Sequence, residues 1–166
     1  MVVLQHALAL GSTHERDLSA LDKGAHLVLG ARGRHALADQ EQRPLRRLQH
    51  VERHEAPTRW GAPSAPIVTG ELSGKRLAFL ARHGEGHTIP PHRINYRANI
   101  AALHELGARR IVGINAVGGI RADMGPRAIV VPDQLIDYTH DRASSFCDSA
   151  GEAVRHVDFS EPYSAD

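Results

Sequence analysis

The chain has 166 residues, enough for one domain with a sizeable apolar core. It carries 20 Lys plus Arg against 19 Asp plus Glu, and the formal net charge of +1 argues against a protein whose main partner is nucleic acid. The single cysteine, Cys147, cannot form an internal disulfide, and no apolar run is long enough to cross a bilayer. Because the N-terminus also lacks a secretory signal pattern, we expect a cytoplasmic protein without a membrane partner.

The first 56 residues differ in composition from the rest of the chain. They contain no isoleucine and no aromatic residue, which makes them a poor source of strands. One short strand is predicted at residues 26–29. The Arg-rich and Gln-rich run at residues 43–53 is interpreted as a solvated helix or a disordered arm rather than a nucleic-acid contact. We therefore treat residues 1–56 as a divergent segment and residues 57–166 as the domain proper.

Beyond residue 60 the sequence alternates between short apolar runs and turn residues. Strands are predicted at residues 67–71 and 76–82, and the tight turn Ser73-Gly74-Lys75 between them predicts a hairpin. A helix is predicted at residues 94–106, where apolar residues recur at helical spacing and Gly107 supplies a C-terminal stop.

Three more strands are predicted towards the C-terminus, at residues 110–115, 128–131 and 155–159. Strand, helix and strand in this order predict an α/β fold. Cys147, next to Phe146, is expected to be a small packed residue.

A polar loop directly follows the strand predicted at residues 76–82. It holds Arg82, His83 and His87, separated by two glycines and a glutamate. An arginine fork matches the oxygen geometry of phosphate, and Gly84 and Gly86 allow the backbone to approach a ligand closely. The loop therefore predicts an anion site.

Two other interpretations of this loop stay open on spacing alone. His83 and His87 are four residues apart, as two zinc ligands on a helix would be, but the glycines and the following Pro90 and Pro91 make a poor helix. No further ligand pattern accompanies them, so we predict no metal site. Alternatively, Arg82 pairs with a carboxylate and the histidines are simply exposed.

A second small-residue loop, Asn115-Ala116-Val117-Gly118-Gly119, follows the strand predicted at residues 110–115. Ligands of open α/β sheets gather beyond the carboxyl ends of strands, so this loop is placed to present backbone amides to a ligand. The alternative is a glycine-rich turn that only connects two core strands.

Four ordered blocks of the sequence, residues 82–98, 115–120, 131–139 and 156–163, resemble the methylthioadenosine phosphorylase branch of the purine nucleoside phosphorylase family. The amino-acid sequence of these blocks is most similar to that of the bacterial S-methyl-5'-thioinosine phosphorylases, and the resemblance extends over residues 61–163. It implies a partial nucleoside-phosphorylase-like mixed sheet flanked by helices, with residues 57–166 as the N-terminal part of the phosphorylase domain.

The activity implied by the resemblance is phosphorolysis. A 5'-methylthio purine nucleoside, methylthioinosine or methylthioadenosine, would give free purine and 5-methylthioribose 1-phosphate. Inorganic phosphate is the co-substrate, no cofactor is needed, and the resemblance implies a homo-oligomer, a trimer. The family's C-terminal half is not matched, so a phosphate-binding or structural remnant that is catalytically incomplete is the alternative function, and a His-based metal hydrolase is a more distant one.

The resemblance also implies roles for individual residues, although it assigns no catalytic residue. His156 would reach the 5' end of a nucleoside in a neighbouring subunit, and Asn115 replaces a hydroxyl residue of the family. The phosphate-binding set would be Arg82, His83, Asn115 and Ala116, and the substrate-binding set Ala116, Val117, Gly118 and His156.

The family's N-terminal phosphate loop has only a weak counterpart here. Relatives open with a strand and a Gly-Gly-Ser/Thr-Gly loop, whereas this chain has Leu10-Gly11-Ser12-Thr13. The hypothesis that follows is that residues 1–56 are not the family's N-terminal element. Because the C-terminal half is also unmatched, we expect exposed strand edges and exposed apolar surface.

Overall fold

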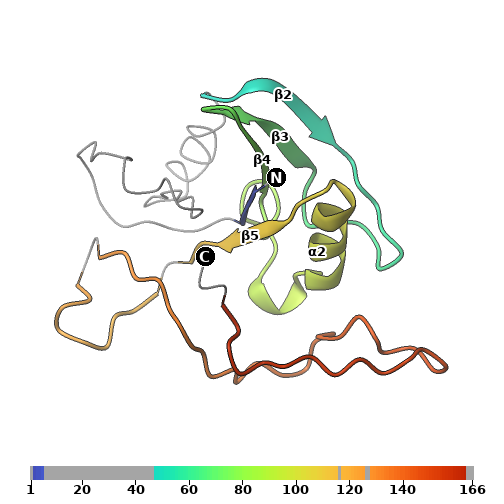
Figure 1. Cartoon of the computed structure of the whole chain (residues 1–166), viewed down its shortest axis with the longest axis vertical. Coiled ribbons are helices and arrows are strands. Elements are labelled where there is room, and N and C mark those ends of the chain that lie inside the picture. The colour runs from blue at the N-terminus through green and yellow to red at the C-terminus, as the bar shows by residue number, and fades with distance from the viewer. Residues whose placement is uncertain (1, 6–46, 116, 126–127, 164–166) are drawn as a thin grey trace.

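The computed structural model describes residues 2–5, 47–115, 117–125 and 128–163. These residues form a mixed five-stranded sheet and one main helix, which confirms the predicted α/β class (Figure 1). The strands are β1 (Val2–Gln5), β2 (Gln49–His54), β3 (Ile67–Leu72), β4 (Lys75–Leu80) and β5 (Arg110–Gly113). A short 3-10 helix η2 (Pro91–Arg93) and the helix α2 (Tyr96–Glu105) lie between β4 and β5.

The strand order in the sheet is β2-β3-β4-β1-β5. β2 pairs with β3 and β3 with β4 in antiparallel fashion, whereas β1 is parallel to both of its neighbours, β4 and β5. The carboxyl ends of β4 and β5 therefore lie at the same edge of the sheet, on either side of β1. This arrangement brings together the two loops in which the sequence predicts ligand-binding residues.

The predicted hairpin is confirmed. Leu72 pairs with Lys75, so a two-residue turn connects β3 and β4. Both turn residues have positive φ, +51° at Ser73 and +73° at Gly74, as the hairpin turn that suits twisted strands requires.

Helix α2 begins and ends with capping hydrogen bonds. The Asn95 side chain accepts from the Ala98 amide at 3.1 Å, which caps the first turn. At the other end Gly107 has a φ of +85°, and its amide and that of Ala108 donate to the carbonyls of His104 and Leu103. The observed helix lies within the predicted residues 94–106.

The two faces of the sheet bury different apolar clusters. α2 covers one face, where Ala98, Ala101, Ala102 and Leu103 of the helix are buried and the core joins it to strands β3 and β4 through Ile67, Ala78 and Leu80. On alternate positions of β4, Leu77 and Phe79 turn to a smaller cluster that includes Leu48, Val112 and Ile114. β4 therefore packs on both faces, and its carboxyl end is held at a defined place.

A buried amide attaches α2 to the loop before β3. Asn99 is fully buried; its carbonyl oxygen accepts from the Ser64 amide at 2.7 Å, and its amide group donates to the Ser64 hydroxyl at 3.0 Å. The Asn95 amide donates to the Trp60 carbonyl at 2.8 Å. These bonds satisfy polar groups that would otherwise be buried without partners.

The structure describes one of the two elements predicted within the first 56 residues. Residues 49–54 form strand β2, so the solvated helix or disordered arm predicted at residues 43–53 is wrong there. The outer edge of β3 offers a row of unpaired backbone groups, and pairing with it overrides a composition that disfavours strands. The strand predicted at residues 26–29 lies outside the described residues.

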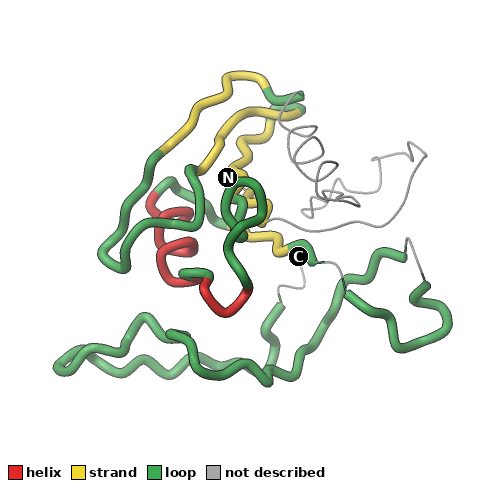
Figure 2. Tube along the Cα trace, turned by 180° about the vertical axis from the view of Figure 1, so that it is seen from behind, coloured by secondary structure: helices red, strands yellow, loops and turns green. Residues whose placement is uncertain are grey.

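The strands predicted at residues 128–131 and 155–159 are also wrong. After β5, Figure 2 shows the described residues as loop throughout. Apolar alternation produces a strand only where a neighbouring strand supplies hydrogen bonds, and none is paired with these residues in the described sheet. Cys147 is exposed rather than packed.

The final segment, described at residues 114–115, 117–125 and 128–163, carries the exposed apolar surface that the sequence predicts. Ile120 is fully exposed, and several other large apolar side chains are at least half exposed: Val117, Ile129, Val131, Ile136, Tyr138, Val154, Val157 and Phe159. A surface of this kind is typical of an interaction face. Within the described part of the chain, no helix has the length and apolar character needed to cross a membrane.

We predict that Asn99→Ala lowers the free energy of unfolding by about 2 kcal/mol, because the buried Ser64 amide and hydroxyl lose their partner. Urea denaturation measures the change. His104→Ala, at an exposed position of the same helix, is the control and should change stability by less than about 0.5 kcal/mol. Equal effects of the two substitutions would contradict the role assigned to Asn99.

Candidate functional site

The loop after β4 is built from consecutive backbone turns. The Gly84 amide donates to the Ala81 carbonyl at 2.9 Å, and the Ile89 amide donates to the His83 carbonyl at 2.8 Å. Gly84, Gly86 and His87 have φ values of +76°, +77° and +57°. Only glycine adopts such values without steric cost, so the two glycines are needed for the loop to fold back on itself.

Arg82 joins this loop to the one after β5. Its Nε donates to Nε2 of His83 at 3.2 Å, and its Nη1 donates to the Ile114 carbonyl at 3.2 Å. The guanidinium is half-buried, and loss of solvation lowers the pKa of Arg82. Within the described residues Nη2 makes no hydrogen bond, so this nitrogen stays available to donate to an anion.

His83 holds Arg82 in place as a neutral imidazole. Its Nδ1 lies 2.9 Å from the Ile89 carbonyl, which can only accept, so Nδ1 carries the proton and Nε2 accepts from Arg82. Burial lowers the pKa of His83, and the charges of Arg82 and His87 lower it further against the opposing effect of the Ile89 carbonyl. A second proton would place N–H against N–H between His83 and Arg82.

His87 packs against His83. The two ring centroids are 4.4 Å apart, with the rings inclined by 30°. Among the described residues, no group of three His, Cys, Asp or Glu side chains could hold a metal ion.

The other predicted site residues are brought together only in part. Asn115, Val117 and Gly118 follow Ile114, whose carbonyl accepts from Arg82, and all three are exposed at the same edge of the sheet. His156 is exposed in the final segment and makes no hydrogen bond with any described residue. Ala116 and the stretch Leu10-Gly11-Ser12-Thr13 lie outside the described residues.

Sequence reasoning missed two interactions of the loop that carries Arg82. One is the hydrogen bond to the Ile114 carbonyl, which no side-chain pattern can indicate. The other is the ion pair between Arg53 and Glu85, which fastens the loop to β2 across 32 positions of the chain. The opposite charges of the two residues are visible in the sequence, but only the sheet register brings them together.

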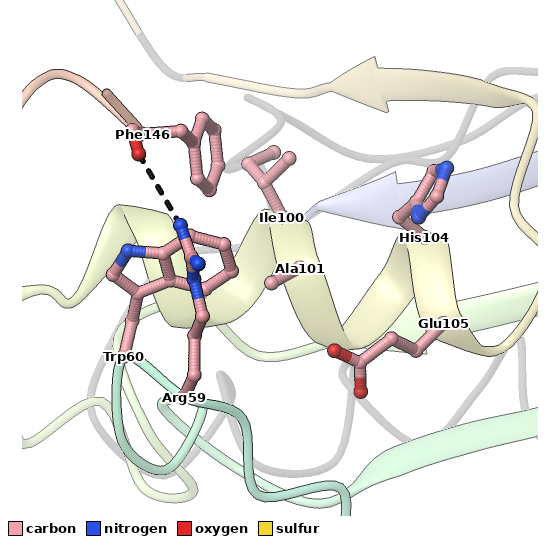
Figure 3. Close-up of a pocket in the computed structure, with 7 residues that line it drawn as sticks. All are labelled: Arg59, Trp60, Ile100, Ala101, His104, Glu105 and Phe146. Atoms are coloured by element: carbon pink, nitrogen blue, oxygen red, sulfur yellow. Dashed lines mark hydrogen bonds between the residues drawn. The ribbon is translucent and has the colours of Figure 1, made fainter. Parts of the chain in front are cut away.

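A separate hollow of about 540 Å³ lies on the outer side of α2 (Figure 3). Trp60 and Phe146 meet edge to face with centroids 4.9 Å apart, and the Arg59 guanidinium lies 4.2 Å from the Trp60 ring. Arg59 also forms an ion pair with Glu152 at 3.2 Å. None of the predicted site residues lines this hollow, which serves as the place where the final segment docks on the helix.

We expect Gly84→Ala to be more destabilising than Gly74→Ala. Both positions have a φ near +75°, so each variant carries about 1 kcal/mol of backbone strain. A Cβ at Gly84 would also lie 3.1 Å from Ile89 Cγ1 and Cδ1, whereas a Cβ at Gly74 meets nothing within 4 Å. Chemical denaturation should show an extra loss of about 1 kcal/mol for Gly84→Ala; equal losses would mean that the loop is not closely packed.

We also predict an acid-sensitive stability that depends on His83. Because its pKa in the folded state is lower than the usual value of about 6.5, the unfolded state binds more protons below that pH. Stability is therefore unaffected above pH 6.5 and is lost as the pH falls towards the lower folded value. Urea denaturation between pH 7.5 and 5 should show a steeper loss for the wild type than for His83→Gln, whose amide can still donate to the Ile89 carbonyl. An imidazole titration by NMR with a midpoint at or above about 6.5 would contradict this.

The chain is similar in sequence to curated phosphorylases. The chain is 59% identical over 120 residues to a probable S-methyl-5'-thioinosine phosphorylase of Xanthomonas campestris pv. campestris, covering 72% of this chain and 48% of that protein. It is 49% identical over 116 residues to an S-methyl-5'-thioadenosine phosphorylase of Hyperthermus butylicus, covering 70% of this chain and 42% of that protein. The chain thus spans about half the length of the curated relatives it matches.

Solved structures show the same likeness. A methylthioadenosine phosphorylase from an antarctic soil metagenomic library superposes on 97% of this chain and 44% of its own with a TM-score of 0.68 and 34% identity. The Schistosoma mansoni methylthioadenosine phosphorylase in complex with adenine covers 68% of this chain and 40% of its own, with a TM-score of 0.65 and 36% identity. The predicted resemblance is confirmed, and because the family model of the Phosphorylase superfamily matches residues 36–166, the chain belongs to that superfamily.

Proposed function

We propose that this protein takes part in the phosphorolysis of a 5'-methylthio purine nucleoside, methylthioinosine or methylthioadenosine. The products are free purine and 5-methylthioribose 1-phosphate, in purine and methylthio salvage. The observation that carries the proposal is the half-buried Arg82. Its Nε and Nη1 connect the loops after β4 and β5, while its Nη2 has no hydrogen-bond partner among the described residues. The names of the relatives support the nucleoside as the second substrate.

The chemistry requires phosphate to be held against the sugar. A phosphate oxygen attacks the anomeric carbon while the bond to the purine nitrogen breaks, and the bonding electron pair leaves with the purine, which takes up a proton. The sugar passes through an oxocarbenium-like state, as in other glycosyl transfers. Arg82 binds and orients the phosphate. His83, which the sequence predicts as a phosphate ligand, orients Arg82 instead, because both of its ring nitrogens are engaged by Arg82 and the Ile89 carbonyl. The attack thus becomes a positioned reaction without reorganisation of the site.

The nucleoside would lie beside the loop after β5. We propose that Asn115 and Ala116 complete the phosphate contacts through amide groups, and that Ala116, Val117 and Gly118 line the purine and ribose. His156 is proposed to act across a subunit boundary, which fits its position in the exposed final segment. The exposed apolar side chains of that segment support assembly into a homo-oligomer, for which we propose a trimer.

We propose further that residues 57–166 are the N-terminal part of the phosphorylase domain, and that residues 1–56 are a segment divergent in sequence that still supplies strands β1 and β2 to the sheet. In this proposal the reaction needs no cofactor, since phosphate is the nucleophile, and the protein acts in the cytoplasm. A second candidate function is a phosphate-binding remnant without turnover. The observation in its favour is the exposed apolar surface of the segment after β5.

Arg82→Ala should weaken the binding of inorganic phosphate by about 10-fold to 100-fold, the range expected for losing hydrogen bonds to a charged group. Isothermal titration calorimetry on the 166-residue chain measures this. Arg76→Ala removes the same charge from an exposed position of β4 and should change the dissociation constant less than about twofold.

Release of purine from both nucleosides, with and without phosphate, separates the two candidate functions. Phosphate-dependent release that is lost in Arg82→Ala supports the phosphorylase. Phosphate binding through Arg82 without any release supports the remnant. Binding that is unchanged in Arg82→Ala would overturn the assignment of the phosphate site.

A further inference from the structure

A bidentate ion pair fastens the tip of the loop after β4 to the edge strand β2. Nη1 of Arg53 donates to Oε1 of Glu85 at 2.7 Å, and Nη2 donates to Oε2 at 3.1 Å. Both side chains are about half exposed, at 52% and 60%. A single surface ion pair contributes little to stability, so the role of this one is to be sought in what it positions.

The sheet register places Arg53 where it can reach the loop. Arg53 pairs with Val68 of β3, and Val68 pairs with Phe79 of β4. The three residues form one row across the sheet, next to the point where β4 ends and the loop begins. Figure 1 shows β2 as the outer strand of this side of the sheet.

Glu85 is the single carboxylate of the loop at residues 82–89, and it lies between the two glycines. The hydrogen bond from Arg53 lowers the pKa of Glu85, so its side chain is ionised at neutral pH. An unpaired carboxylate three positions from Arg82 would repel a phosphate bound there. The two glycines of the loop, both at positive φ, also give it backbone freedom that an anchor at its tip restricts.

We propose that Arg53 is a positioning residue for phosphate. Its bidentate ion pair with Glu85 neutralises the carboxylate of the loop after β4 and holds this loop in the conformation that presents Arg82. Arg53 does not itself contact phosphate. This inference rests on the proposed function, since it concerns the same phosphate site.

The test compares phosphate dissociation constants, measured by calorimetry on the full chain, for Arg53→Ala, Glu85→Gln and the double variant. Arg53→Ala should weaken binding about threefold to tenfold, because the loop that carries Arg82 then bears one unpaired negative charge. The double variant should return to within about twofold of Glu85→Gln, since the neutral amide no longer needs a partner. Arg76→Ala is the matched loss of one positive charge and should have less than about a twofold effect.

Rescue by Glu85→Gln distinguishes positioning from other roles. A double variant that binds as weakly as Arg53→Ala, or an Arg53→Ala variant that binds like Arg76→Ala, would overturn the inference. Thermal unfolding of each variant, measured in parallel, shows whether the fold is kept. A purely structural role would lower the melting temperature of Arg53→Ala without a phosphate affinity that Glu85→Gln restores.

The same experiment separates this inference from the proposed function. Phosphate binding that is lost in Arg82→Ala but unaffected by Arg53→Ala supports the phosphate site and overturns only the role proposed for Arg53. Binding that does not depend on Arg82, or no binding by the wild-type chain, overturns both.

Discussion

The hydrogen bond from Arg82 to the Ile114 carbonyl is the interaction on which the candidate site depends. It connects the loop after β4 to the loop after β5, although 32 positions separate the two residues. The bond can form because both strands run in the same direction on either side of β1 and end at one edge of the sheet. The packing of α2 against β4 holds that edge in place, and so core packing sets the position of a charged group.

Burial around Arg82 has opposite consequences for the two side chains of the site. Arginine keeps its charge even when loss of solvation lowers its pKa, so Arg82 stays a cation in a half-buried place. Histidine gives up its proton under the same conditions, and the neutral ring can then accept a hydrogen bond from the arginine. The site therefore combines one permanent charge with one orienting group.

The segment after β5 has a different physical character from the sheet. It contacts α2 through the ion pair of Arg97 with Asp148 and through Arg142 over the Tyr96 ring, and it contacts the loop before β3 through Arg59 with Glu152 and Trp60 with Phe146. Most of its large apolar side chains face solvent instead of a core. Since burying such side chains contributes most of the free energy that stabilises a fold, this segment is held far less strongly than the sheet.

Much of the local structure of this protein could be predicted from residues close together in the sequence. The Ser73-Gly74 turn, the Asn95 cap and the Gly107 stop are decided by neighbours in the chain, so the hairpin and helix α2 could be predicted closely. The motif around Arg82 and His83 predicts an anion loop. Strand formation at residues 49–54, 128–131 and 155–159 was predicted wrongly, because a strand exists only if a partner edge is present and periodicity carries no information about partners. The sequence by itself determined the chemical groups of the site and the local elements that carry them. The tertiary structure alone decided that Ile114 accepts from Arg82, that His83 is neutral and that Arg53 pairs with Glu85, since each depends on register and burial across residues far apart in the chain.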